Sequence, residues 1–162
     1  MNANDRTGAQ AEPVIRKVML VVDGSLASEQ AAQFAYRFAA QVQCALEAVF
    51  VIDTATMDYL QQMRIFVSDE RRDLECALEE KGQNYLERTH LLGKAFGLDI
   101  ATTILRGRFH DTVIRHARAC HADAVIIGGW RRTSHDKDTF SVERELVMQF
   151  AECPVFVIKA KG

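Results

Sequence analysis

The chain alternates short apolar runs with longer amphipathic stretches from one end to the other. Residues 14–22 are rich in β-branched side chains and nearly continuous in their apolar second half, which is typical of a central strand covered on both faces. Further strands are expected at residues 45–52, 99–105, 124–127 and 155–158. Strict alternation with helices predicts an α/β fold: a single-domain, open, twisted, parallel five-stranded sheet with helices on both faces.

The stretches between the strands carry apolar residues at helical spacing. Ser25 or Ser28 is expected to cap the first helix. A short helix is expected within residues 55–67, and a long one is expected to run from Ser68 to a glycine stop at Gly97. The last two helices are expected at residues 109–120 and 142–151. The inward stripe of the long helix is predicted to comprise Leu74, Leu78, Tyr85, Leu92 and Ala95.

The 162 residues suit one domain, predicted at residues 14–162 after a disordered leader at residues 1–13. A net charge of −2 gives no electrostatic case for nucleic-acid binding. No apolar run approaches the roughly 18–20 residues that a membrane span needs. The four scattered cysteines form no C-x-x-C pair, so reduced thiols and a cytoplasmic location are predicted.

Several pieces of the sequence, taken in order, carry a family resemblance. They are Val-Val-Asp-Gly-Ser at residues 21–25, Val-Phe-Val-Ile-Asp at 49–53, Gly107-Arg108, Ala-Asp-Ala-Val-Ile-Ile-Gly at 122–128 and Cys-Pro-Val-Phe-Val-Ile at 153–158. Over residues 14–160 the chain resembles the universal stress protein family. The resemblance implies an adenine-nucleotide alpha-hydrolase-like sheet of order 3-2-1-4-5, and a dimer joined through the fifth strands.

Members of that family that bind ATP have a glycine motif in which backbone N–H groups hold the phosphates. The motif is Gly, two residues, Gly, nine residues, then Gly followed by Ser or Thr. Counted from Gly128, the second glycine falls on Arg131, the third on Ser141 and the hydroxyl position on Val142. A slip of one residue would place Ser141 at the hydroxyl position but Phe140 at the glycine. The motif is therefore degenerate in this chain.

Other positions match the family pattern. Asp23 corresponds to the acidic residue beside the adenosine, and Val51 to the residue whose backbone contacts adenine. Both positions also serve the fold. The candidate nucleotide-binding residues are Val22, Asp23, Val51, Gly128, Gly129, Arg131, Arg132, Ser141 and Val142.

The basic loop after Gly129 has two interpretations. Arg131, Arg132 and Lys137 can form a side-chain clamp on phosphate, since guanidinium groups bind phosphate in a bidentate manner. The alternative is a solvated loop, in which arginine in place of glycine blocks the site. Trp130 can stack on a base or meet a partner, but it is expected to cover the edge of its own core.

Other chemistries lack the residues that they require. The third strand ends without the aspartate of a phosphorylated receiver domain, and no Ser-His-Asp order or nucleophile elbow is present. The loop after Asp23 does not match that of the related nucleotide hydrolases. His116 and His121 are five residues apart, a poor spacing for one helix face, so no metal site is predicted.

The last strand is short and apolar, and it is expected at a sheet edge, where an unpaired strand invites association. A homodimer is predicted through Val155, Phe156, Val157 and Ile158; the alternative is an edge protected by the C-terminal tail. The prediction is a dimeric regulatory or stress-response protein without tight ATP binding and without an enzymatic reaction of its own. The alternative is a sensor that binds ATP or AMP, with slow hydrolysis left open.

Overall fold

The computed structural model describes residues 11–130 and 139–161. Within these residues five parallel strands form one sheet of order β3-β2-β1-β4-β5. The predicted architecture and strand order are therefore confirmed. The strands are β1 (Lys17–Val21), β2 (Ala45–Asp53), β3 (Ala101–Gly107), β4 (Ala124–Gly128) and β5 (Val155–Ile158).

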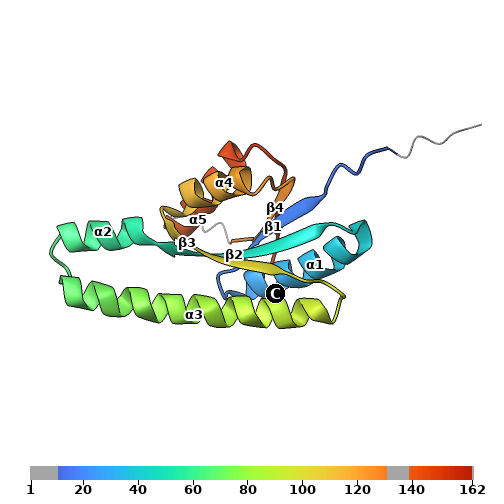
Figure 1. The fold of residues 1–162 in the computed structure, drawn as a ribbon. Helices are drawn as coiled ribbons and strands as arrows, with labels where there is room; N and C mark the ends of the chain where they lie inside the picture. The colour runs from blue at the N-terminus through green and yellow to red at the C-terminus, as the bar shows by residue number, and fades with distance from the viewer. Residues whose placement is uncertain (1–10, 131–138, 162) are drawn as a thin grey trace, which may run out of the picture.

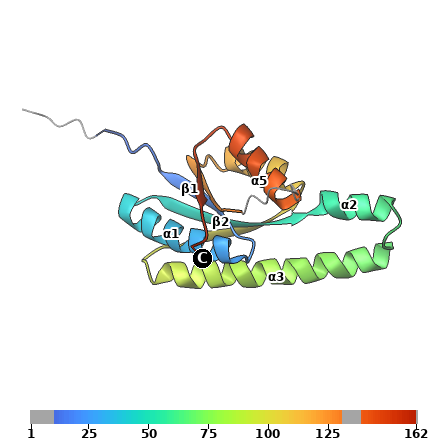
Figure 2. The ribbon, with the colours of Figure 1, turned by 180° about the vertical axis from the view of Figure 1, so that it is seen from behind.

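Helices cover both faces of this sheet. Figure 1 shows α1 and α3 below the sheet and α4 and α5 above it, and Figure 2 shows the same layers from behind. Each strand of the centre therefore buries side chains on both faces. The helices are α1 (Leu26–Val42), α2 (Thr54–Gln62), α3 (Ser68–Lys94), α4 (Phe109–Ala119) and α5 (Thr139–Phe150).

Two apolar clusters fill the space between the layers. Leu20 and Ile126 belong to the cluster under α1 and α3, whereas Met19, Val125 and Val113 belong to the cluster under α4 and α5. Successive strand residues thus point to opposite faces, as the pleat of a strand requires. This alternation decides which polar residues of the strands share a face.

The ends of some elements differ from the predictions. β1 begins at Lys17, and Val14 is 90% exposed. β3 begins at Ala101 because strand pairing starts there, opposite Glu47 of β2, although Ile100 is already buried. The last helix starts at Thr139, three residues before the predicted position. This earlier start matters, because it makes Phe140 part of the helix.

The inward stripe of α3 was predicted incorrectly at its ends. Leu74 and Leu92 are 40% and 39% exposed, and the buried positions of the helix are Gly82, Leu86, Thr89 and Gly93. A Cβ atom at Gly82 would lie only 2.5 Å from the ring of Phe50. The glycine, which costs about 1 kcal/mol in helix propensity, therefore lets the helix approach the sheet closely.

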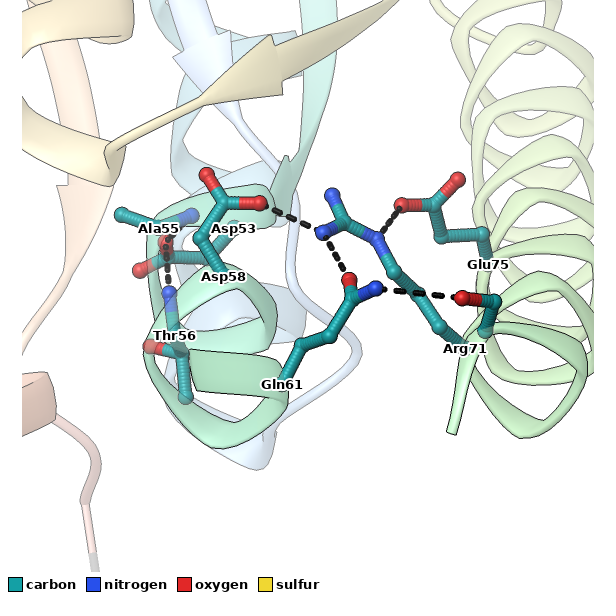
Figure 3. Close-up of polar contacts among 8 residues, drawn as sticks. Asp53, Ala55, Thr56, Asp58, Gln61, Arg71 and Glu75 are labelled. Atoms are coloured by element: carbon teal, nitrogen blue, oxygen red, sulfur yellow. Dashed lines mark hydrogen bonds and ion pairs between the residues drawn. The ribbon is translucent and has the colours of Figure 1, made fainter. Parts of the chain in front are cut away.

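The helix α2 and the first turns of α3 extend beyond the sheet and lie side by side (Figure 1). Figure 3 shows the polar contacts that join them. Arg71 Nη1 lies 2.6 Å from Asp58 Oδ1 and donates to Gln61 Oε1 at 2.7 Å, while its Nε donates to Glu75 Oε1 at 2.9 Å. Asp53 caps α2 by accepting hydrogen bonds from two backbone N–H groups. The predicted short helix within residues 55–67 is thus confirmed.

Candidate functional site

A pocket of about 310 Å³ opens at the carboxyl ends of β1 and β2, between α2, α4 and α5. This is the end of a parallel α/β sheet at which ligands bind. The pocket is mainly apolar, with charged groups on its wall. Its lining residues are Val22, Asp23, Phe50, Val51, Asp53, Thr56, Phe109, Thr139, Phe140, Glu143 and Arg144.

Asp23 follows β1 directly, and the turn after the strand holds its side chain. Its Oδ1 accepts a hydrogen bond from the Ser25 backbone N–H at 2.8 Å. Its own N–H donates to the Ser28 hydroxyl, and Ser25 caps α1 by accepting from the Ser28 N–H. Gly24 has a φ of 81°, a value that suits glycine. The turn therefore directs the second oxygen of Asp23 toward α5.

That second oxygen is already occupied by a side chain of the protein. Arg144 Nη2 donates to Asp23 Oδ2 at 2.6 Å. Arg144 is only 4% exposed, and its guanidinium carbon lies 3.1 Å from the centre of the Phe140 ring and 4.4 Å from that of Phe109. The guanidinium thus contacts two rings and is paired with a carboxylate. Its positive charge lies against the residue that the family resemblance predicts beside the adenosine.

A second contact joins α4 to α5 beside the pocket. Glu143 Oε2 accepts hydrogen bonds from the His110 backbone N–H at 2.9 Å and lies 2.6 Å from His110 Nδ1. The side chains of His110 and Glu143 are 15% and 12% exposed. Glu143 precedes Arg144 in sequence, so this contact also holds the helical turn that carries the buried arginine.

Three of the predicted nucleotide-site residues, Val22, Asp23 and Val51, meet in this pocket. Ser141 and Val142 lie half-buried in the first turns of α5, outside the lining. Arg131, Arg132 and Lys137 lie outside the described residues.

The predicted glycine turn is explained by packing. A Cβ atom at Gly128 would lie 2.7 Å from the Ser28 nitrogen and 2.8 Å from the Ala27 carbonyl carbon. At Gly129 it would lie 3.1 Å from the Ile158 carbonyl oxygen, which accepts a hydrogen bond from the Gly129 N–H. Both glycines thus serve contacts within the fold. Trp130 packs against the cluster under α4 and α5, which confirms that it covers the core edge.

The predictions from the sequence missed Arg144, Phe109 and Phe140. A usable signal was present, because Phe140 and Arg144 are four residues apart and therefore share one helix face. That face also carries the fully buried Val147. An arginine in line with a buried apolar position has to be paired, and Asp23 is the partner.

No helix among residues 11–130 and 139–161 is both long and apolar enough to cross a membrane.

Comparison with known proteins gives relatives along nearly the whole chain. A universal stress protein of Methanocaldococcus jannaschii is 25% identical over 148 residues, which cover 91% of this chain and 84% of that protein. The solved structure of the universal stress protein UspA from Lactobacillus plantarum has a TM-score of 0.73 and 19% identity. It matches 89% of this chain and 97% of its own.

Two further solved structures contain nucleotides. A universal stress protein family protein from Arabidopsis thaliana with AMP bound has a TM-score of 0.65 and 20% identity, covering 91% of this chain and 93% of its own. A universal stress protein in complex with cAMP has a TM-score of 0.64 and 17% identity, covering 91% and 98%. At these identities the likeness shows the fold.

The family itself is shown by the sequence. The model of the universal stress protein family matches residues 15–159, which include every strand and helix described above. By this match the chain belongs to the universal stress protein family.

Proposed function

We propose that this protein is a regulatory or stress-response member of its family that works as a homodimer and does not bind ATP tightly. The carrying observation is the ion pair between the buried Arg144 and the half-buried Asp23. A nucleotide that used Asp23 would have to displace a cation that is 4% exposed and in contact with two aromatic rings. The degenerate glycine motif supports the same conclusion, because it removes the positions at which a backbone approaches phosphate closely.

The second candidate function is an adenine-nucleotide sensor, in which basic side chains replace the glycine loop. Two observations favour it. The pocket beside Asp23 and Val51 measures about 310 Å³, which is at the lower end of the roughly 300–1,000 Å³ of small-molecule sites. Solved relatives contain AMP or cAMP. In this function the ligand would be ATP or AMP, and Arg131, Arg132 or Arg144 would face its phosphate.

The nucleotide content of the purified protein separates the two functions. Acid-released nucleotide is identified by mass, and ATP and AMP are then titrated while the fluorescence of Trp130, the single tryptophan, is followed. We expect an empty protein and no saturable response below about 1 mM nucleotide. Co-purified nucleotide, or a saturable response at lower concentration, would support the sensor instead.

A pair of variants tests whether the arginine closes the pocket. Arg144→Met keeps most of the side-chain volume but releases Asp23, and we expect AMP to bind at least about tenfold more tightly than in the original protein. Arg118→Met is the matched control, because Arg118 is exposed and pairs with Glu152 on the outer surface. Equal affinities for AMP in both variants would mean that Arg144 does not close the pocket and that the broken glycine motif excludes the nucleotide. Arg131→Gly tests that second explanation.

The proposed dimer joins the outer edges of two β5 strands. Among the described residues β5 pairs with β4, and its four residues are half-buried. Phe156 packs toward α1, while Val157 packs under α4 and α5, so the strand is anchored on both faces. Sedimentation velocity is expected to show a dimer that Val157→Pro dissociates, because proline removes an N–H from the outer edge of β5. Val42→Lys, at an exposed site of α1, should leave the dimer intact. A monomer at all concentrations would contradict this part.

A further inference from the structure

A second polar cluster lies on the sheet face under α4, toward the amino ends of the strands. Glu47 of β2 shares this face with Val49, which belongs to the cluster under α4 and α5. His116 lies on α4 and Cys120 caps the end of that helix; the two are four residues apart and thus on one helix face. Lys17 begins β1, and Thr103 lies on β3.

The three potential ligand atoms of Glu47, His116 and Cys120 all lie within 4.8 Å of one another. Glu47 is 6% exposed, and the other two residues are half-buried. A carboxylate oxygen, an imidazole nitrogen and a thiol sulphur thus face one point from a strand and a helix. Zinc is bound by these three donor types, and a site with three protein ligands leaves a fourth position open.

The carboxylate of Glu47 is held in its ionised form. Burial raises its pKa, but hydrogen bonds with Lys17 and His116 outweigh that effect and lower the pKa to about 2. Its Oε1 lies 2.7 Å from His116 Nε2 and accepts from the Thr103 hydroxyl at 3.2 Å. Its Oε2 pairs with Lys17 Nζ at 2.8 Å. Lys17 therefore occupies one oxygen and His116 the other.

We propose that Glu47 Oε1, His116 Nε2 and Cys120 Sγ bind one Zn²⁺ ion, with water in the fourth position. The ion replaces the hydrogen bond between His116 and Glu47. It takes the thiolate of Cys120, whose proton leaves to solvent, so that the two ligand anions balance the two charges of the metal. Lys17 stays on the outer oxygen and orients the carboxylate, as second-shell partners do.

The cysteine distinguishes this cluster from an ordinary ion-pair network. Lys17, Glu47 and His116 already form a connected set without it. The Cys120 thiol lies beside the Glu47 carboxylate and contacts the Ala117 carbonyl oxygen at 3.7 Å, and burial raises the pKa of this thiol. A thiol adds little to an ion pair, whereas its sulphur supplies the third protein ligand of a zinc site. Sequence spacing alone predicted no metal site, because His116 and the exposed His121 are poorly spaced on a helix and Glu47 lies far away in the sequence.

The test is a Co²⁺ titration of the full chain, reduced and freed of metal by a chelator, followed by competition with Zn²⁺. A thiolate ligand gives Co²⁺ a charge-transfer absorption that no oxygen or nitrogen ligand produces. We expect one saturable site with that absorption, and displacement by Zn²⁺ with a Kd of about 1 µM or tighter. Cys120→Ser should abolish the charge-transfer band.

Affinity for Zn²⁺ should fall in His116→Ala and Cys120→Ser by more than the roughly 10–100-fold that loss of an outer partner costs. The controls are His121→Ala and Cys76→Ser, which change one exposed residue of each type and should bind like the original protein. Circular dichroism checks that each variant is folded. Absence of a saturable thiolate band, or equal loss in the controls, would mean that the cluster is an ion-pair network only.

Discussion

The two ends of the sheet, on the face under α4 and α5, each pair a carboxylate with a cation from the same chain. At the carboxyl end the half-buried Asp23 meets the buried Arg144, whose guanidinium lies against two phenylalanine rings. At the amino end Glu47 meets Lys17 and His116, and the thiol of Cys120 lies beside them. Both ends are polar, yet the groups around each carboxylate differ in what they can bind.

The difference lies in the donor atoms. A guanidinium has only N–H donors and keeps its charge, so the carboxyl end already contains its own permanent counter-ion. Imidazole and thiol can each lose a proton and offer a lone pair, so the amino end can exchange its proton for a metal ion. A carboxylate that is wholly or partly shielded from water needs a partner in either case. The identity of that partner decides whether the site is closed or open to a ligand.

Arg144→Ala is expected to have the largest effect on stability. Removing the buried arginine leaves the half-buried Asp23 without its cation, and it also removes the contacts of the guanidinium with Phe109 and Phe140. We expect the free energy of unfolding to fall by about 3 kcal/mol, measured by urea denaturation. Arg118→Ala, which breaks an exposed pair with Glu152, should change it by no more than about 0.5 kcal/mol. Similar losses of stability in both variants would contradict the role of Arg144 in closing the pocket at the carboxyl ends of the strands.

Gly128→Ala tests whether the glycine at the end of β4 is needed for packing. The added Cβ atom would meet the backbone of Ala27 and Ser28, which cannot move without shifting the start of α1. We expect a loss of about 2 kcal/mol in the free energy of unfolding. Thermal unfolding without nucleotide is the measurement, because a glycine kept only for phosphate would tolerate alanine in the empty protein.

Glu47→Gln tests the charge of the polar cluster at the amino ends of the strands in the absence of metal. The amide keeps the shape and an acceptor oxygen but loses the charge that faces Lys17 and His116. We expect a loss of about 1.5 kcal/mol in urea denaturation with a chelator present. Thr103→Val, which removes the neutral hydrogen bond to the same oxygen, should cost less. Added Zn²⁺ should stabilise the original protein and leave Glu47→Gln nearly unchanged.

Asp123→Asn should give the smallest effect, and one that depends on pH. Hydrogen bonds from the backbone N–H groups of Arg16 and Lys17 hold the pKa of Asp123 below its usual value. A lowered pKa in the folded state means that the contribution to stability is present at neutral pH and is lost as pH falls through that pKa. The stability difference between the original protein and the variant should therefore stay constant from pH 7 down to about pH 4, near the ordinary pKa of aspartate, and shrink below it. A difference that stays constant below that pH would contradict the role of the charge.

Much of the fold could be predicted from local patterns. Apolar runs and helical spacing depend on neighbours within a few residues, and they indicated the five strands and the short helix before Ser68. The order of the strands in the sheet came from the family resemblance. The local patterns also brought Asp23 and Val51 to one end of the sheet, because parallel strands end at the same edge. Errors appeared where burial depends on the partner element, as at Leu74 and Leu92 of α3.

The chemistry at both ends depended on contacts between residues far apart in sequence. Asp23 and Arg144 are separated by 121 residues, and Glu47 and His116 by 69. Local periodicity can turn Arg144 toward the core, but it contains no information on which side chains meet across a sheet. The amino-acid pattern was sufficient for the layers, since hydrophobic burial is non-directional. The two polar sites required the tertiary structure, because ion pairs and metal ligands depend on the positions of individual atoms within a few ångströms.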